Sequence, residues 1–139
     1  MARPRFHLSD TAQQVLGGFL LAGPFVVTEE VWTLARHMSW VHSAVTVAIV
    51  FALGYGALYQ ADEDRDPDRE ADVVGVPVRF VSLLIVSYGS VAILALVFAA
   101  PEAFLADLPP AERPAVTVRA VGVGAFFSVV GAATADSLF

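Results

Sequence analysis

The segment Gly17–Trp32 reads GGFLLAGPFVVTEEVW and puts glycines, a proline and two adjacent carboxylates into one apolar stretch. The apolar run extends from Thr11 to Leu34, about 24 residues, which is enough for a helix to cross the ~30 Å hydrocarbon core of a bilayer. A secretory signal would have an apolar region of only ~7–15 residues, followed by a small-residue cleavage site. We therefore expect a retained first membrane helix over residues 11–34.

Three further apolar runs have the length of a membrane span, about 20 residues each, and they cover residues 41–59, 80–100 and 115–135. Apolar residues make up 57% of the 139 residues, above the roughly 45–50% of soluble domains. They occur in blocks with the charges crowded between them, whereas a soluble chain would spread them at helix or strand periods. The sequence predicts one all-α domain over residues 1–139, a bundle of four transmembrane helices in the lipid bilayer.

Arginine is distributed unevenly between the segments that flank these runs. Five arginines lie in the amino-terminal segment and the acidic loop 60–79, and three lie on the other side of the predicted membrane. The positive-inside rule counts arginine and largely ignores acids. We therefore expect a multi-pass protein of the cell membrane with both termini and the loop 60–79 in the cytoplasm. On the other side, Pro101 suits the first turn of a short helix along the membrane surface, with Phe104, Leu105 and Leu108 on one side of it.

Composition excludes several classes of function. All eight basic residues are arginine and the formal net charge is −6, a balance typical of proteins from extreme halophiles, and there is no basic patch for nucleic acid. There is no cysteine, and we find no nucleophile with its base, phosphate-binding glycine loop or HExxH spacing. We expect neither an enzyme nor a cofactor. The three histidines, His7, His37 and His42, are too scattered for a metal site.

The acidic loop contains a calcium-loop pattern that does not continue. Asp62, Asp64, Asp66 and Asp68 alternate, but Pro67 stands where the turn needs glycine, and Val73 stands where the ion needs a bidentate glutamate. We interpret the segment as a solvated loop.

Small residues at fourfold spacing predict where helices approach one another, because close backbone contact drives helix association in lipid. One row lies on the second predicted helix and another on the fourth. The rows serve either packing within one chain or an interface between copies in a homo-oligomer, and their members are Ala44, Ala48, Ala52 and Gly56, and Gly124, Ser128 and Ala132.

The carboxylates of Glu29 and Glu30 are the candidate functional groups, because an acid at membrane depth is costly unless it is neutral, paired or wet. Pro24 removes a helix hydrogen bond near them and leaves a backbone acceptor available. Glu29 shares a helical face with Gly18 and Arg36, which favours Glu29 toward the bundle interior. One hypothesis is a homo-oligomeric cation or proton pathway with Glu29, Glu30, Pro24 and Thr28 as its candidate residues. The alternative is a non-catalytic structural or accessory subunit, in which Glu29 pairs with Arg36 or another group near that end and Glu30 extends to the interface or bonds with His37, His42 or an indole.

The same segment resembles the first helix of a family of small integral membrane proteins of unassigned function. The shared pattern is glycine, a small residue, proline, then threonine, glutamate and tryptophan, at Gly18, Ala22, Pro24, Thr28, Glu30 and Trp32. The resemblance implies a multi-pass membrane fold. The chain is also similar in outline to store-operated calcium channels, with Arg3, Arg5, Gly18 and Glu29 in the corresponding places, although Pro24 departs from that pattern.

Overall fold

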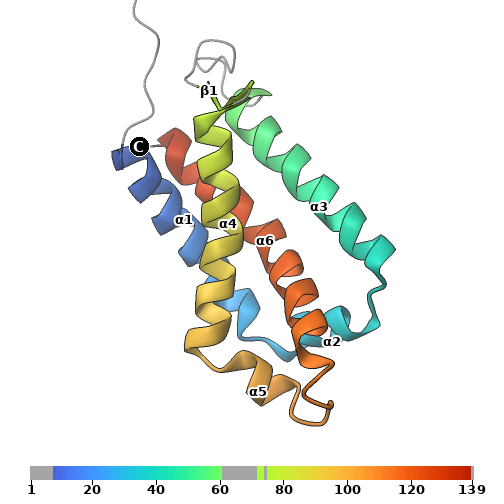
Figure 1. Ribbon diagram of the computed structural model, residues 1–139. Coiled ribbons are helices and arrows are strands. Elements are labelled where there is room, and N and C mark those ends of the chain that lie inside the picture. Colours follow the sequence, from blue (N-terminus) through green and yellow to red (C-terminus); the bar gives the residue numbers. More distant parts are fainter. Residues whose placement is uncertain (1–7, 61–71, 74, 139) are drawn as a thin grey trace, which may run out of the picture.

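The computed structural model describes residues 8–60, 72–73 and 75–138, and the described chain is mainly helical (Figure 1). The calcium-loop pattern, His7, Arg3, Arg5, Arg65 and Arg69 lie outside these residues. A short antiparallel hairpin, with two residues in each strand, directly precedes the helix that begins at Val78. In chain order the elements are α1 (Leu8–Val26), α2 (Glu29–His37), α3 (Trp40–Tyr55), the π-helical turn η1 (Gly56–Gln60), β1 (Asp72–Val73), β2 (Val76–Pro77), α4 (Val78–Val97), α5 (Ala100–Phe104) and α6 (Arg113–Leu138).

Three described helices are long and apolar enough to cross a membrane: the continuous helix of α3 and η1 (Trp40–Tyr59), α4, and α6 over Arg113–Ser137. The pair α1 and α2 adds a fourth crossing if it counts as one bent span. The all-α prediction is confirmed, and a membrane location is compatible with these helices.

The tightest packing joins α1, α4 and α6, and α3 packs mainly on α6. Figure 1 shows the amino-terminal end of α1 beside the carboxyl-terminal end of α6, with α3 along one side of the bundle. A buried apolar cluster around Trp32, Val91, Leu105 and Val116 fills the end near α2 and α5. A second cluster, with Val50, Leu83 and Val129 among its members, joins α3 to α4 and α6.

The prediction of one continuous helix over residues 11–34 differs from the structure, in which α1 ends at Val26 and α2 leaves it at an angle of 79°. The break follows Pro24, which lies inside α1. Thr28 directs both its backbone N–H and its hydroxyl to the carbonyl oxygen of Phe25, at 3.1 and 2.7 Å. The indole N–H of Trp32 donates to the carbonyl of Val26 at 2.9 Å. These bonds satisfy carbonyls that the end of a helix leaves without partners, so the chain turns without exposing them.

The other helix bounds are close to the predicted ones, with one early ending. The run predicted over 80–100 stops at Val97, because Ala99 adopts a left-handed conformation with φ of 53°. Pro101 then occupies the first turn of the short helix α5, as predicted. Leu105 is fully buried, and Phe104 and Leu108 pack on the core around Trp32. The apolar side of this connection therefore faces the bundle of its own chain.

The two small-residue rows have different surroundings. Gly124, Ser128 and Ala132 on α6 are buried inside the chain, as is Gly18 on α1. The row on α3 faces outward: Ala44, Ala48 and Ala52 are exposed, and Gly56 is half-buried in η1. Intramolecular packing thus accounts for the α6 row but not for the α3 row.

The backbones of α1 and α6 approach closely at Gly17 and Gly131. A Cβ atom on Gly17 would collide with the carbonyl oxygen of Gly131, and a Cβ on Gly131 would collide with that of Gly17. Neither backbone can yield unless the helices separate. Glycine is therefore required at both positions by the distance between the helices.

We predict that Gly131→Ala lowers the stability of the protein by about 1–3 kcal/mol, because the added methyl overpacks a backbone contact. Gly89→Ala is the control, since a Cβ there has no neighbour within 4 Å and alanine favours a helix by roughly 0.5–1 kcal/mol over glycine. The measurement is the midpoint of thermal unfolding in detergent, followed by circular dichroism. Equal midpoints for the two variants would contradict the proposed contact.

Candidate functional site

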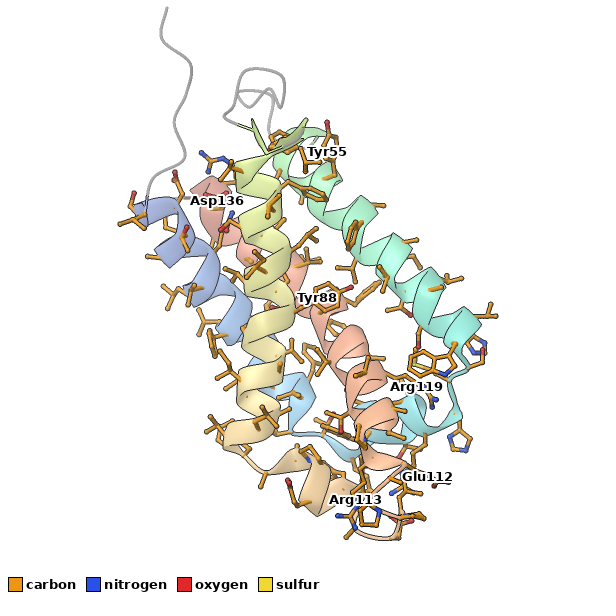
Figure 2. The ribbon with its side chains drawn as sticks, in the orientation of Figure 1. Tyr55, Tyr88, Glu112, Arg113, Arg119 and Asp136 are labelled. Carbon is orange, nitrogen blue, oxygen red and sulfur yellow. The ribbon has the colours of Figure 1, made fainter. Side chains whose placement is uncertain are left out.

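A buried polar cluster joins the ends of α1, α4 and α6, and we define it by Asp10, Gln14, Arg79, Ser82 and Asp136. The Nη1 atom of Arg79 donates to both carboxylate oxygens of Asp136, at 2.8 and 3.0 Å. Its Nη2 atom reaches Oδ2 of Asp10 at 3.4 Å. The side chain of Arg79 is 7% exposed and that of Asp136 is fully buried. Figure 2 places Asp136 near the start of α1 and the start of α4.

Gln14 occupies the centre of this polar cluster and is fully buried. Its Nε2 donates to Oδ2 of Asp136 at 3.1 Å and, at 3.3 Å, to the backbone carbonyl of Arg79. Its Oε1 accepts a hydrogen bond of 2.7 Å from the hydroxyl of Ser82. The amide therefore has partners on both sides, and the cluster connects three helices through charge-assisted bonds that fix their relative positions.

Sequence reasoning did not identify the polar cluster as a site. It assigned Arg79 to the end of the acidic loop, whereas the structure places it in the first turn of α4. A signal was present, because Gln14 is one helical turn before Gly18 on the small-residue face of α1, and Asp136 continues the α6 row one turn beyond Ala132. Both polar residues lie on faces that pack inward.

A smaller polar contact lies deeper in the bundle. The hydroxyls of Ser90 and Ser128 are 3.0 Å apart, and Ser128 donates to the carbonyl of Gly18 at 3.2 Å. Beyond them, toward α2, the buried cluster around Trp32 and Val91 is apolar. Polar side chains therefore occupy only part of the length of the interior between α1, α4 and α6.

The predicted carboxylates lie outside this interior. Glu29 and Glu30 occupy the first turn of α2, and both are exposed. Pro24 is exposed on α1, and the hydroxyl of Thr28 donates to the backbone of Phe25. Glu29 lines a surface hollow with Arg36 and Asp107, while Glu30 lines a neighbouring hollow with Glu29 and Thr33. The structure thus separates the candidate pathway residues from the centre of the bundle.

Arg36 connects α2 to the segment between α5 and α6. Its guanidinium forms an ion pair with the carboxylate of Asp107, with Nη1 donating to Oδ2 at 2.9 Å. Nη2 also donates to the carbonyl of Phe104 at 2.6 Å. The hydrogen bond from Arg36 and one from the backbone lower the pKa of Asp107 from 3.8 to about 2. One alternative from the sequence pairs Glu29 with Arg36 or another nearby group, and in the structure Arg36 forms its ion pair with Asp107.

An apolar groove opens between α3, α4 and α6, with a volume of about 570 Å³. Val47, Ala92 and Gly122 are among the small and apolar residues that line it. Arg119 lies at its edge, with its guanidinium carbon 4.8 Å from the centre of the Trp40 ring. Figure 2 shows Tyr88 and Arg119 at different heights along this side of the bundle.

Within the described residues, no three histidine, aspartate or glutamate side chains gather in a way that could hold a metal ion. No protein-family model, curated protein or solved structure matches this chain. The resemblance of the segment Gly17–Trp32 to a family of small membrane proteins stays a prediction.

We predict that Asp136→Asn destabilises the protein by about 3–5 kcal/mol, the cost of breaking a buried ion pair by removing one partner. The double variant Arg79→Met, Asp136→Leu should recover much of that loss, since no charge of the pair then remains buried. Thermal unfolding in detergent measures both. If the double variant is as unstable as the sum of its single substitutions, the pair is not coupled as described.

Asp107 provides a pH-dependent prediction. Because its pKa in the folded protein lies below the ordinary 3.8, the stability from its pairing with Arg36 is complete above that ordinary value and is lost as the pH falls through about 2. The carboxyl ¹³C resonance of Asp107 should therefore titrate with a midpoint near pH 2. In Arg36→Gln that midpoint should rise toward the ordinary pKa of an aspartate. A resonance unaffected by Arg36→Gln would contradict the assigned cause.

Proposed function

We propose that this chain is a non-catalytic membrane protein that acts as a structural or accessory subunit through lateral contacts in the bilayer. In this proposal, four crossings are made by α1 with α2, α3 with η1, α4 and α6, and both termini are cytoplasmic. The observation that carries the proposal is the combination of a closed interior with an outward-facing row of small residues on α3.

The closed interior argues against a pathway through one chain. The backbones of α1 and α6 touch at Gly17 and Gly131. The rings of Phe25 and Phe127 stack with centroids 3.9 Å apart. A packed apolar segment offers an ion neither water nor polar groups to replace its hydration shell, and the cluster around Trp32 is buried and apolar.

The outward face of α3 supports the lateral role. Over its most apolar stretch this helix is the least buried of the three single spans, with 17% of residues buried against 39% in α4 and 44% in α6. Ala48 and Ala52 are exposed one turn apart. Small residues in such a row let a second helix approach closely, which is how helices associate in lipid. The first partner to test is another copy of the chain.

A cation or proton pathway is the second candidate, and the exposure of Glu29 and Glu30 favours one that forms between copies. Both carboxylates lie at one end of α2 and line adjoining hollows. In a homo-oligomer, these acids could surround an axis and attract a cation, with Thr28 and Pro24 behind them. Such a pathway would depend on assembly, which separates it from transport by a single chain.

Flux through liposomes containing the purified chain tests the two candidates. Wild type, Glu29→Gln and Glu30→Gln should all show the background flux of empty liposomes for protons, sodium, potassium and calcium. Wild-type flux that disappears in Glu29→Gln or Glu30→Gln, with folding unchanged, would reject the structural proposal and favour the pathway.

Oxidative crosslinking tests the lateral contact, because the chain has no native cysteine. A disulfide needs Cα atoms about 4.4–6.8 Å apart, and a close contact between the α3 helices of two copies would bring residue 48 of each to that distance. Ala48→Cys should therefore form disulfide-linked dimers in membranes. Leu20→Cys is the matched control, because Leu20 is also exposed, at 66%, but lies on α1. Equal crosslinking at both positions would indicate random collision and would remove the support for α3 as the contact face.

A further inference from the structure

The apolar groove between α3, α4 and α6 extends along only part of the bundle. It begins near Trp40, at the start of α3. Val50 is fully buried, and at Gly54 a Cβ atom would lie 3.0 Å from Cγ2 of Val129, so α3 and α6 meet there. The ten helical steps from Trp40 to Val50 rise about 15 Å, which is about half of a ~30 Å hydrocarbon core.

This depth restricts what can fill the groove. A transmembrane helix of a partner would have to run through the whole membrane, and it would lose contact where α3 closes on α6. An acyl chain of a lipid occupies a single leaflet and matches the depth. The volume of about 570 Å³ falls within the roughly 300–1,000 Å³ of small-molecule sites.

The polar atoms at the groove indicate the kind of lipid. Arg119 has no carboxylate within ion-pair distance among the described residues, and its Nε atom is buried without a hydrogen-bond partner. Its Nη1 atom donates only a long bond of 3.4 Å to the carbonyl of Ala35. The side chain also borders a second hollow, lined by Arg36, His37 and Glu112 together with apolar residues. A cation at the end of an apolar groove complements a phosphate joined to an acyl chain.

Two further side chains line the groove with buried oxygens that lack partners, the hydroxyls of Ser43 and Tyr88. Ser43 is one turn from Trp40, the residue whose ring lies against Arg119, and Tyr88 lies halfway along α4. Buried polar atoms in proteins normally have partners. An ester carbonyl could accept from Ser43, which gives the same orientation of the lipid as the phosphate on Arg119.

We propose that the groove between α3, α4 and α6 binds one anionic phospholipid, with its phosphate on Arg119 and one acyl chain between Val47, Tyr88 and Gly122. The site lies in the leaflet on the side of the turn between α2 and α3. It meets the outward row of α3 at Ala44, which lines the groove, whereas Ala48 and Ala52, the positions of the proposed lateral contact, do not.

Native mass spectrometry of the detergent-solubilised chain tests this site with dioleoyl phosphatidylglycerol as the probe. Wild type should retain one lipid and prefer it over dioleoyl phosphatidylcholine. Arg119→Gln should weaken phosphatidylglycerol binding about tenfold, because it removes a charge-assisted bond. Arg113→Gln removes a positive charge six residues away on the same helix and should have no such effect.

A second pair of variants tests the groove without changing charge. Gly122→Leu should abolish retention of both lipids, since Gly122 lines the groove and a Cβ there meets open space. Gly89→Leu is its control, because Gly89 also has open space but does not line the groove. Circular dichroism and thermal unfolding check that each variant is folded.

Three outcomes would overturn the proposal. The first is equal phosphatidylglycerol binding by wild type, Arg119→Gln and Gly122→Leu. The second is displacement of the lipid by millimolar inorganic phosphate, which would show that the site holds a free anion without an acyl chain. The third is a copy of the chain crosslinked through Val47→Cys, which would show that protein fills the groove.

Discussion

The contact between the backbones of α1 and α6 is the constraint on which the other packing depends. Gly17 and Gly131 let the two helices touch without side chains between them. At that separation Ser128 reaches the carbonyl of Gly18, and Gln14 reaches Asp136. A wider spacing would lengthen each of these bonds. In a bilayer, where burial of apolar surface does not drive helices together, such close contacts supply the association.

Small residues on the helices face inward in one part of the bundle and outward in another. On α1, α4 and α6, small residues and buried polar groups face one another, so these helices satisfy their contacts within the chain. On α3 the corresponding small residues face away, and its packed side consists of residues such as Val50 and Gly54. The helix α3 therefore packs closely on α4 and α6 near η1 and leaves a groove between itself and these helices near Trp40.

The sequence predicted the helices because apolar blocks of membrane-spanning length are a strong and local signal. It predicted that the helix kinks or loosens at Pro24 but not that it ends at Val26, because the turn depends on where the indole of Trp32 and the hydroxyl of Thr28 find carbonyls. That break changes the reading of Glu29 and Glu30, since the helical face inferred for them assumed a continuous α1. The pairing of Arg79 with Asp136 joins residues 57 positions apart. The spacing of residues along one helix cannot predict a contact between two helices so far apart in sequence. The row on α3 had the correct spacing, but spacing alone cannot distinguish an inward face from an outward one.

The polar cluster also has a consequence for how the chain folds during synthesis. Gln14 and Asp136 are separated by 122 positions, so α1 is translated well before one of the partners of its buried amide. Arg79 likewise remains without its main carboxylate until α6 is complete. Until α6 packs, these side chains lack the contacts with Asp136 that they have in the finished protein. A chain that stops before Asp136 would lose the two short bonds to that carboxylate and would leave Arg79 with the longer contact to Asp10, at 3.4 Å.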